Sequence, residues 1–295
     1  MKEVFPHIQQ VFGEVKVLES SPFPSGMAFP IHRLKLRTPE GPLDVVVKLY
    51  PAGFQAAFER EARALQTLPV HQVPVPELLG TSELADSSAL VMEWIEGCPL
   101  MDLLDQEGWM QRFVEQLVQI HLPVETLQLQ NRSEHAERWH SRFENGFQSQ
   151  YAGVLAWVEQ HLQDAAALGP VLLHQDYHPW NVLVRPAGGL VVLDWDWSVG
   201  DPREDVAWTR FILQKASRPE LAEDFTQGYC ALVPEARDHL EVFDVLAHLR
   251  WLQMLDRPSA RGPITEEIRQ WIEHLKAETH QLIQTITGIS VTQGN

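Results

Sequence analysis

Cysteine, basic charge and long apolar runs are all scarce in this 295-residue sequence. The two cysteines, Cys98 and Cys230, cannot build a disulfide framework or a four-cysteine zinc site, and they indicate free thiols in a reducing compartment. Lysine and arginine together number 23 against 40 aspartates and glutamates, which gives a formal net charge of −17. Because so acidic a chain repels phosphate backbones and anionic lipid, nucleic acids and membrane surfaces are poor partners for it.

Apolar runs are short throughout the chain. No stretch approaches the roughly 18 apolar residues that a membrane span requires. The first six residues, Met1 to Pro6, contain a glutamate and a proline where a secretory signal needs an apolar segment. We therefore expect a cytoplasmic protein.

The overall composition is that of a globular protein, with 44% hydrophobic and 21% charged residues. At about 150 residues per domain, the length indicates two domains. Short β-type runs fill the part before Gly97, and helical patterns fill most of the part after it. We predict an N-terminal lobe over residues 1–96 and a C-terminal lobe over residues 97–295.

The residue patterns predict an antiparallel sheet in the N-terminal lobe. Residues 31–38 alternate charged residues with leucine, a period of two that indicates a half-exposed strand, and a Pro/Gly turn leads into a second run over 43–50. Apolar residues at helical spacing predict a helix over 53–68. Further strands are expected at 14–19, 77–83 and 88–95.

The C-terminal lobe is predicted to be mainly helical. Helices are expected at 109–122, 134–150, 154–168 and from Pro202 almost to the end, with two short β-runs at 182–185 and 190–193. The predicted fold class is therefore α+β, with a small antiparallel-sheet lobe that carries one helix and a larger, mainly helical lobe. Ligands prefer the cleft between such lobes.

Two charged residues interrupt apolar patterns in the N-terminal lobe. Lys48 sits in an apolar strand run, and Glu61 lies on the apolar stripe of the following helix, between Phe58 and Leu65. An unpaired buried ammonium is costly, so Lys48 either reaches water or has a partner. An inward carboxylate after an inward lysine favours an ion pair that orients the lysine. The structural alternative is an edge-strand lysine and a helix-edge glutamate.

A polar loop between apolar β-runs holds the densest cluster of chemistry. It runs from His174 to Asn181 and includes Asp176 and His178, and the next β-run leads into Asp194. Asp176, Asn181 and Asp194 supply hard oxygen ligands for magnesium and leave one carboxylate to orient a hydroxyl. Phosphoryl transfer needs this equipment, because its catalysis is mainly positioning and charge neutralisation. The alternative is a polar turn with helix-capping residues.

The segment after Gly200 precedes another predicted helix. Asp201 fits the N-cap position, Pro202 the first helical turn and Glu204 the reciprocal position of a capping box. Asp205 is not needed for that cap, which leaves it available to brace the polar loop.

These motifs resemble those of a known superfamily. The string His174-x-Asp176-x-His178-x-x-Asn181, the run Asp194-Trp-Asp196 and the block Gly200-Asp201-Pro202-x-x-Asp205 are similar to motifs of the aminoglycoside phosphotransferase and choline kinase-like superfamily. The resemblance covers nearly the whole chain, since Lys48, Glu61 and a hinge-like segment at Met92–Ile95 fall in the expected order. It implies a protein-kinase-like fold, in which residues 1–96 form the nucleotide-binding lobe and residues 97–295 the helical catalytic and acceptor-binding lobe.

The resemblance also implies a role for each matching position. Asp176 looks like the catalytic base that accepts the proton of the acceptor hydroxyl. Asn181 and Asp194 look like magnesium ligands that bridge the nucleotide phosphates. Lys48 is similar to the lysine that contacts the α- and β-phosphates, with Glu61 as its ion-pair partner.

The remaining implied contacts are with the nucleotide. Backbone groups at Glu93 and Ile95 are expected to hold the purine edge, and Ser25 and Gly26 belong to the phosphate-covering loop. That loop departs from the kinase pattern, because residues 20–27 contain one glycine and two prolines where a kinase has several glycines. The implied cofactors are Mg²⁺ and ATP, with GTP as an alternative.

The spacing of the motifs favours a small acceptor molecule. Only six residues separate Asp194 from Asp201, which leaves no room for the activation segment on which a protein kinase docks a peptide. The resemblance and the acidic balance favour an amine-bearing acceptor such as an aminoglycoside. A choline- or ethanolamine-like ammonium held by aromatic side chains, homoserine, a sugar and a macrolide are the alternatives within this class.

Two other function classes are open from the residues alone. His174, Asp176 and His178 have the chemistry of a zinc site, as in a metal-dependent hydrolase, but this leaves Lys48 and Glu61 without a role. The chain is alternatively an inactive nucleotide-binding protein. The pattern indicates no oligomeric state.

Overall fold

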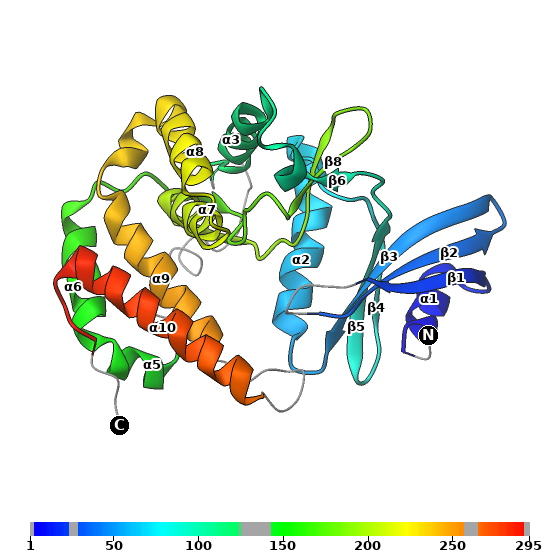
Figure 1. The fold of residues 1–295 in the computed structure, drawn as a ribbon. Coiled ribbons are helices and arrows are strands. Elements are labelled where there is room, and N and C mark those ends of the chain that lie inside the picture. The colour runs from blue at the N-terminus through cyan, green and yellow to red at the C-terminus, as the bar shows by residue number, and fades with distance from the viewer. Residues whose placement is uncertain (1–2, 24–28, 124, 126–142, 257–264, 292–295) are drawn as a thin grey trace. The chain divides into compact units, whose positions relative to one another are not determined.

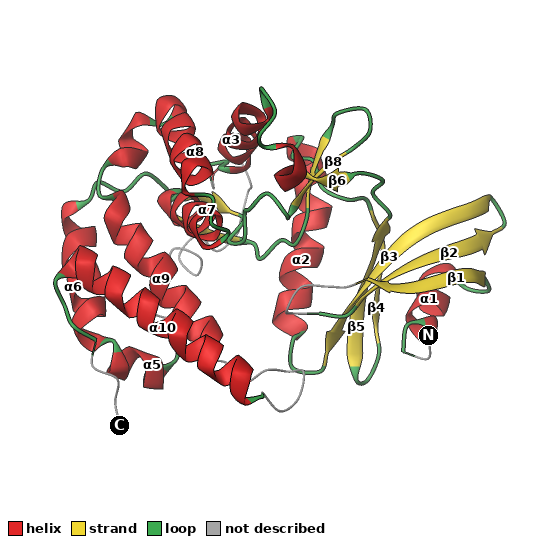
Figure 2. Cartoon of the chain, viewed as in Figure 1, coloured by secondary structure: helices red, strands yellow, loops and turns green. Residues whose placement is uncertain are grey.

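The computed structural model describes residues 3–23, 29–123, 125, 143–256 and 265–291. The chain divides into two compact units. Unit 1 contains residues 1–109 and 176–197, and unit 2 contains residues 110–175 and 198–295. Both a sheet-rich and a helix-rich part are present, which confirms the predicted α+β class (Figure 2). The boundary predicted between residues 96 and 97 stays a prediction.

Unit 1 is built on a five-stranded antiparallel sheet with the strand order β1-β2-β3-β5-β4 (Figure 1). The hairpin predicted from the period-two run and its Pro/Gly turn is confirmed, since Ile31–Thr38 pairs along Gly41–Pro51. The three further strands expected in this lobe are also present. The strand bounds are β1 Lys16–Phe23, β2 Ile31–Thr38, β3 Gly41–Pro51, β4 Leu78–Glu83 and β5 Ser87–Glu93.

One face of this sheet packs into an apolar core. Leu34, Val45 and Val91 are buried there together with Ile8 of helix α1, which spans Phe5–Phe12. Helix α1 begins with a proline among its first two residues, a position where a missing N–H costs nothing. The sequence analysis expected no helix before residue 53, so α1 corrects the prediction of a single helix in this lobe.

The opposite face of the sheet carries the polar cluster. Ile31, Lys48 and Leu90 stand directly opposite one another in a cross-strand row, so their side chains share this face. Helix α2, Gln55–Thr67, packs against it through Phe58 and Glu61. The predicted helix at 53–68 is therefore confirmed to within two residues at its start and one at its end.

A second, three-stranded sheet in unit 1 holds the segments next to the polar loop. Its strands are β6 Cys98–Pro99, β8 Val182–Val184 and β9 Leu190–Val192, and the single-turn helices of this unit are η1 Leu68–His71 and η2 Leu100–Leu103. The chain before β6 runs very close to β8, because a Cβ built on Gly97 would lie 2.3 Å from the carbonyl oxygen of Val184. Backbone cannot yield as a flexible side chain does, so only glycine fits there.

Unit 2 is mainly helical, as predicted for the part of the chain after the hinge-like segment. Its helices are α3 Trp109–Ile120 (which begins at the unit boundary), α5 Asn145–Gln150, α6 Ala152–Asp164, α7 Arg203–Lys215, α8 Pro219–Leu232, η5 Pro234–Arg237, α9 Leu240–Asp256 and α10 Glu266–Thr287. Helix α7 packs on both α8 and α9, and α9 also packs on α6 and α10. The first part of the helix predicted at 134–150 lies outside the described residues.

Two short strands also belong to unit 2. They are β7 Val171–Leu173 and β10 Ser198–Gly200, which pair antiparallel. Each lies next to a segment that the sequence analysis singled out, since β7 leads into the polar loop and β10 precedes Asp201. Within the described residues, no helix combines the length and the apolar character needed to cross a membrane.

The contact at Gly97 generates a stability prediction. Gly97→Ala should lower the free energy of unfolding by about 1–3 kcal/mol, because the new methyl group overlaps the carbonyl oxygen of Val184. Gly146→Ala is the matched control: it lies in α5 with open space around a new Cβ, and it should gain about 0.5–1 kcal/mol from reduced chain entropy. Urea denaturation of both variants checks this. Equal midpoints for the two would contradict the close approach.

Candidate active site

Lys48 is the centre of a buried charge cluster in unit 1. Its Nζ lies 2.6 Å from Glu61 Oε2 and 2.7 Å from Asp194 Oδ1. Lys48 is 6% and Glu61 5% exposed, so the lysine does not reach out to water. Of the two alternatives left open by the sequence, the structure therefore contains the ion pair, and it adds a second carboxylate to it.

The protonation of this cluster follows from burial and charge. Burial by itself lowers the pKa of Lys48, but the charges of Asp194 and Glu61 outweigh it and hold the lysine pKa well above its usual value. Burial raises the pKa of Glu61, and this effect exceeds the lowering by Lys48. The lysine is therefore a fixed positive charge at neutral pH.

Tyr50 is a further member of the cluster that the sequence analysis did not single out. Its hydroxyl donates a hydrogen bond to Glu61 Oε2, the same oxygen that Lys48 contacts. Burial and the neighbouring Glu61 carboxylate raise the pKa of Tyr50, which keeps the hydroxyl protonated as a donor. The signal was available, because Tyr50 lies two residues after Lys48 and so shares its face of the strand.

In unit 1, the polar loop places the carboxylate of Asp176 beside the side-chain amide of Asn181. Asn181 Nδ2 lies 3.0 Å from the backbone oxygen of Asp176 and 3.2 Å from its Oδ2. His178 Nε2 lies 3.7 Å from the same Oδ2. The side chain of Asp176 is 35% exposed, so it is fixed by its neighbours and still open to a substrate.

Strand pairing brings this loop next to Asp194. Val182 of β8 stands opposite Val192 of β9, and one residue further along the Leu193 N–H donates to the carbonyl oxygen of Asn181 at 2.8 Å. Asp194 follows directly with a φ of 57°, the left-handed region that non-glycine residues rarely adopt. Such strain persists only where the surrounding structure enforces it, and it is concentrated at functional sites.

Asn181 and Asp194 fit a magnesium ion by their chemistry. Both offer oxygen donors, and Asn181 uses its nitrogen on Asp176, so its Oδ1 is the atom suited to a cation. Magnesium needs only one or two such protein ligands, because substrate phosphates and water complete its shell. Within the described residues, no group of three or more His, Cys, Asp or Glu is placed to hold a metal ion.

Asp205 braces the start of the polar loop within unit 2. Its carboxylate accepts the backbone N–H groups of His174 at 2.7 Å and Gln175 at 2.8 Å, and His121 Nε2 lies 3.3 Å away. Burial raises the pKa of Asp205, but the hydrogen bond and charge of His121, together with His174, outweigh it and lower that pKa overall. The bracing role that the sequence left open for Asp205 is thus present.

The neighbouring Asp201 differs from its predicted role. Helix α7 begins at Arg203 with Pro202 at the N-cap position, one residue later than predicted. Asp201 Oδ1 still accepts the Arg203 N–H at 3.0 Å, and its carboxylate also pairs with the Arg203 guanidinium at 2.7 Å. Arg203 is 1% exposed, so this pair is a buried structural tie rather than a simple cap.

Two residues of unit 2 that the sequence analysis missed also position the loop. Arg250 of α9 donates to the carbonyl oxygen of Gln175 and stacks on the Trp208 ring at 4.0 Å. Gln175, directly before Asp176, has a φ of 72°. His121 Nδ1 lies 2.6 Å from the hydroxyl of Tyr229, which fixes the imidazole that contacts Asp205. No local pattern marks Arg250 or His121, because their partners are distant in sequence.

The hinge-like segment offers one backbone donor. The Glu93 N–H donates to Glu77 O and the Trp94 N–H to Asp44 O. The Glu93 carboxylate accepts from Arg185 at 2.9 Å. In the part of the chain that the structure describes, the Ile95 N–H has no acceptor, so it is the hinge donor left for a ligand. Ser25 and Gly26 lie outside the described residues.

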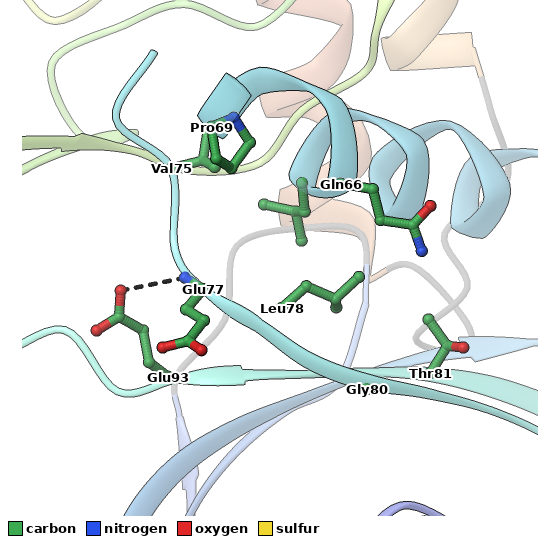
Figure 3. Close-up of a pocket in the computed structure, with 9 residues that line it drawn as sticks. Gln66, Pro69, Val75, Glu77, Leu78, Gly80, Thr81 and Glu93 are labelled. Carbon is green, nitrogen blue, oxygen red and sulfur yellow. Dashed lines mark hydrogen bonds between the residues drawn. The ribbon is translucent and has the colours of Figure 1, made fainter. Parts of the chain in front are cut away.

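The cavity shown in Figure 3 is a different place in unit 1. It has a volume of about 510 Å³ and lies between the end of α2 with η1 and strand β4. Its lining residues are Leu65, Gln66, Pro69, Val75, Glu77, Leu78, Gly80, Thr81 and Glu93. Of the predicted site residues, Glu93 lines this cavity, whereas Lys48, Glu61 and the residues of the polar loop do not.

The brace at Asp205 generates a prediction about pH. A carboxyl with a lowered folded-state pKa contributes stability above its usual value of 3.8, and loses that contribution as the pH falls through the folded pKa. The protein should therefore lose stability on acidification below 3.8, and Asp205→Asn should remove this share of the loss. At neutral pH the same variant should cost about 3 kcal/mol, because two buried N–H groups lose an acceptor.

Urea denaturation near neutrality and in acid measures both effects. Asp224→Asn, on the exposed side of α8, is the control and should behave as the unchanged protein. A pH profile for Asp205→Asn that runs parallel to the unchanged protein would contradict the assignment.

Comparison with known proteins accounts for this arrangement. Residues 20–243 match the model of the phosphotransferase enzyme family. Among solved structures, the aminoglycoside phosphotransferase APH(4)-Ia is 15% identical with a TM-score of 0.64, over 99% of both chains. A putative fructosamine-3-kinase from Haemophilus somnus 129PT is 14% identical with a TM-score of 0.65, over 96% of this chain and 97% of the other.

The choline kinase LicA from Streptococcus pneumoniae is 16% identical with a TM-score of 0.59, over 94% of this chain and 96% of the other. At these identities the neighbours show the fold, which is the predicted protein-kinase-like one. The family model spans most of the sequence and includes every residue of the Lys48 cluster and the polar loop. The chain belongs to the phosphotransferase enzyme family.

Proposed function

We propose that this protein transfers the γ-phosphoryl group of ATP to a hydroxyl of a small molecule, with Asp176 as the base. The observation that carries the proposal is a continuous chain of contacts within unit 1. Lys48 binds Asp194, the residue before Asp194 binds Asn181, and Asn181 binds Asp176. A cation for phosphates, oxygen donors for a metal and a base for a hydroxyl are thus held on one scaffold.

Each residue has a task that its surroundings support. Asp176 accepts the proton of the acceptor hydroxyl, and Asn181 holds one of its oxygens so that the carboxylate keeps its orientation. Asn181 and Asp194 would hold Mg²⁺, which neutralises charge on the phosphates when bound. Lys48, kept protonated by its carboxylate partners, binds the α- and β-phosphates and fixes the leaving group.

The neighbours support nucleotide use and a small acceptor. APH(4)-Ia has been crystallised in ternary complexes with ADP and hygromycin B and with AMP-PNP and hygromycin B. The Ile95 N–H, which has no acceptor among the described residues, suits the edge of a purine, and Glu93 lies two residues before it at the end of β5. ATP is therefore the proposed donor, in preference to GTP.

The acceptor class follows from charge and from the names of the neighbours. A chain with a net charge of −17 attracts cations, and the neighbours include an aminoglycoside phosphotransferase and a choline kinase. We infer an amine-bearing acceptor of the aminoglycoside type. A choline- or ethanolamine-type, homoserine-type or sugar-type kinase is the second candidate, and the fructosamine-3-kinase likeness favours a sugar derivative among these.

Two substitutions test the proposed roles separately. Asp176→Asn should lower kcat about 10²–10⁴-fold, because the base is lost while the nucleotide contacts remain. Asp194→Asn should lower turnover and also weaken binding of ATP with Mg²⁺, since it removes a metal ligand. A screen of phosphate transfer to aminoglycosides, choline, homoserine and sugars measures turnover, and the thermal shift with ATP and Mg²⁺ measures binding.

Asp44→Asn is the matched control. Asp44 lies in the same unit and its side chain is 35% exposed, the same as Asp176. It should keep both turnover and the thermal shift. Full turnover in Asp176→Asn, or no thermal shift in the unchanged protein, would overturn the proposal.

A further inference from the structure

Tyr50 makes a contact in the Lys48 cluster that the proposed reaction does not yet use. The residue is 1% exposed, and its hydroxyl donates to Glu61 Oε2. The same oxygen lies 2.6 Å from Lys48 Nζ. One carboxylate oxygen of Glu61 therefore holds two donors, one from the lysine and one from the tyrosine.

The ring of Tyr50 is fixed independently of its hydroxyl. It packs edge-on against Phe58, with 5.7 Å between ring centroids, and at a tilt against Phe29, with 4.5 Å between ring centroids. Phe58 and Glu61 are three residues apart on α2 and so lie on one face of that helix. Tyr50 thus contacts α2 twice, through its ring at Phe58 and through its hydroxyl at Glu61.

Lys48 is shared between the carboxylates of Glu61 and Asp194, and this sharing explains why Glu61 needs the donor from Tyr50. With phosphates and a metal bound, Asp194 would hold the metal and Lys48 would direct its donors toward phosphate oxygens. Glu61 then shares the lysine with a strongly anionic competitor while it stays buried at 5% exposure. A buried carboxylate with too few donors is costly, so a second donor keeps Glu61 in place.

We propose that Tyr50 is a positioning residue for phosphoryl transfer, whose hydroxyl anchors Glu61 so that Lys48 keeps its place against the nucleotide phosphates. This inference rests on the proposed function. The interaction between the lysine and the leaving group strengthens as charge moves onto the β-phosphate in the transition state. A less well-placed Lys48 should therefore lower kcat more than it weakens binding of ATP.

Tyr50→Phe isolates the hydroxyl, because the ring contacts with Phe58 and Phe29 remain. The assay is the hydrolysis of ATP to ADP with water as the acceptor, which needs no knowledge of the natural acceptor. We expect kcat to fall about tenfold, the effect of losing a hydrogen bond to a charged group, with the KM for ATP changed less than about twofold. An unchanged kcat would overturn the inference.

A double-mutant cycle separates positioning from a general structural effect. If the hydroxyl acts through Glu61, Tyr50→Phe should cost about tenfold in the unchanged protein and less than about twofold in a Glu61→Gln background. Equal losses in both backgrounds would show that the tyrosine acts elsewhere and would overturn the inference.

Tyr151→Phe is the matched control for loss of a buried tyrosine hydroxyl. Tyr151 is 2% exposed, and its hydroxyl lies 2.9 Å from His280 Nε2 in unit 2. This variant should lose stability as Tyr50→Phe does, but keep kcat at a temperature well below both unfolding midpoints. If Tyr151→Phe lowered kcat equally, the effect of Tyr50→Phe would be one of stability and the inference would fail.

The outcome for the unchanged protein distinguishes this inference from the proposed function. If the unchanged protein neither hydrolyses ATP nor shows a thermal shift with ATP and Mg²⁺, the proposed function fails and the positioning role fails with it. If the unchanged protein is active and Tyr50→Phe equals it, only the role of Tyr50 fails.

Discussion

The burial of Lys48 is the constraint from which the nucleotide-side geometry follows. An ammonium group at 6% exposure is stable only with compensating charge, and the chain supplies it from Glu61 and Asp194. These three residues come from a strand, a helix and a loop separated by up to 146 positions in the sequence. Removing either carboxylate would leave a buried charge with one partner. The cluster therefore ties α2 and the Asp194 segment to the sheet.

In the polar loop, side chains hold a backbone segment that has an unfavourable conformation. Gln175 and Asp194 both have positive φ angles. Gln175 directly precedes the proposed base Asp176, and Asp194 is itself a proposed metal ligand. Asp205 accepts two successive backbone N–H groups at the loop's start, and Arg250 donates to the carbonyl oxygen of Gln175. Donors and acceptors therefore hold the peptide segment at His174 and Gln175 from both sides within unit 2.

Local patterns predicted the sheet because its signals are short-range. The alternation in residues 31–38 and the Pro/Gly turn after them define the hairpin without reference to the rest of the chain. Helix α1 was missed because it has only eight residues. Its apolar side chains are explained only by their packing in the core with Leu34 and Val91. Helix α7 begins one residue later than predicted, and the sequence pattern did not indicate that Arg203 would be buried against the Asp201 carboxylate.

In the candidate site, too, short-range sequence signals were found and long-range contacts were not. Lys48 and Glu61 were identified because a charge in an apolar pattern is visible locally, whereas the pairing of Lys48 with Asp194 is visible only in three dimensions. The inclusion of residues 176–197 in the same compact unit as the sheet is likewise set by long-range contacts. Arg250 and His121 follow the same rule, since nothing within ten residues of either one indicates a partner in the loop. Sequence patterns therefore identify reactive groups better than the residues that hold them.

The charge of the chain and the charge of the site act in opposite directions on the reactants. With a net charge of −17, the field of the whole protein attracts Mg²⁺ and an amine-bearing acceptor and repels a free triphosphate. Under the proposed function, nucleotide binding would therefore rely on short-range contacts, among them the buried Lys48 and a metal that enters with the phosphates. The position of Lys48 would then affect phosphoryl transfer more than binding of ATP, because its interaction with the leaving group strengthens as charge moves onto the β-phosphate in the transition state.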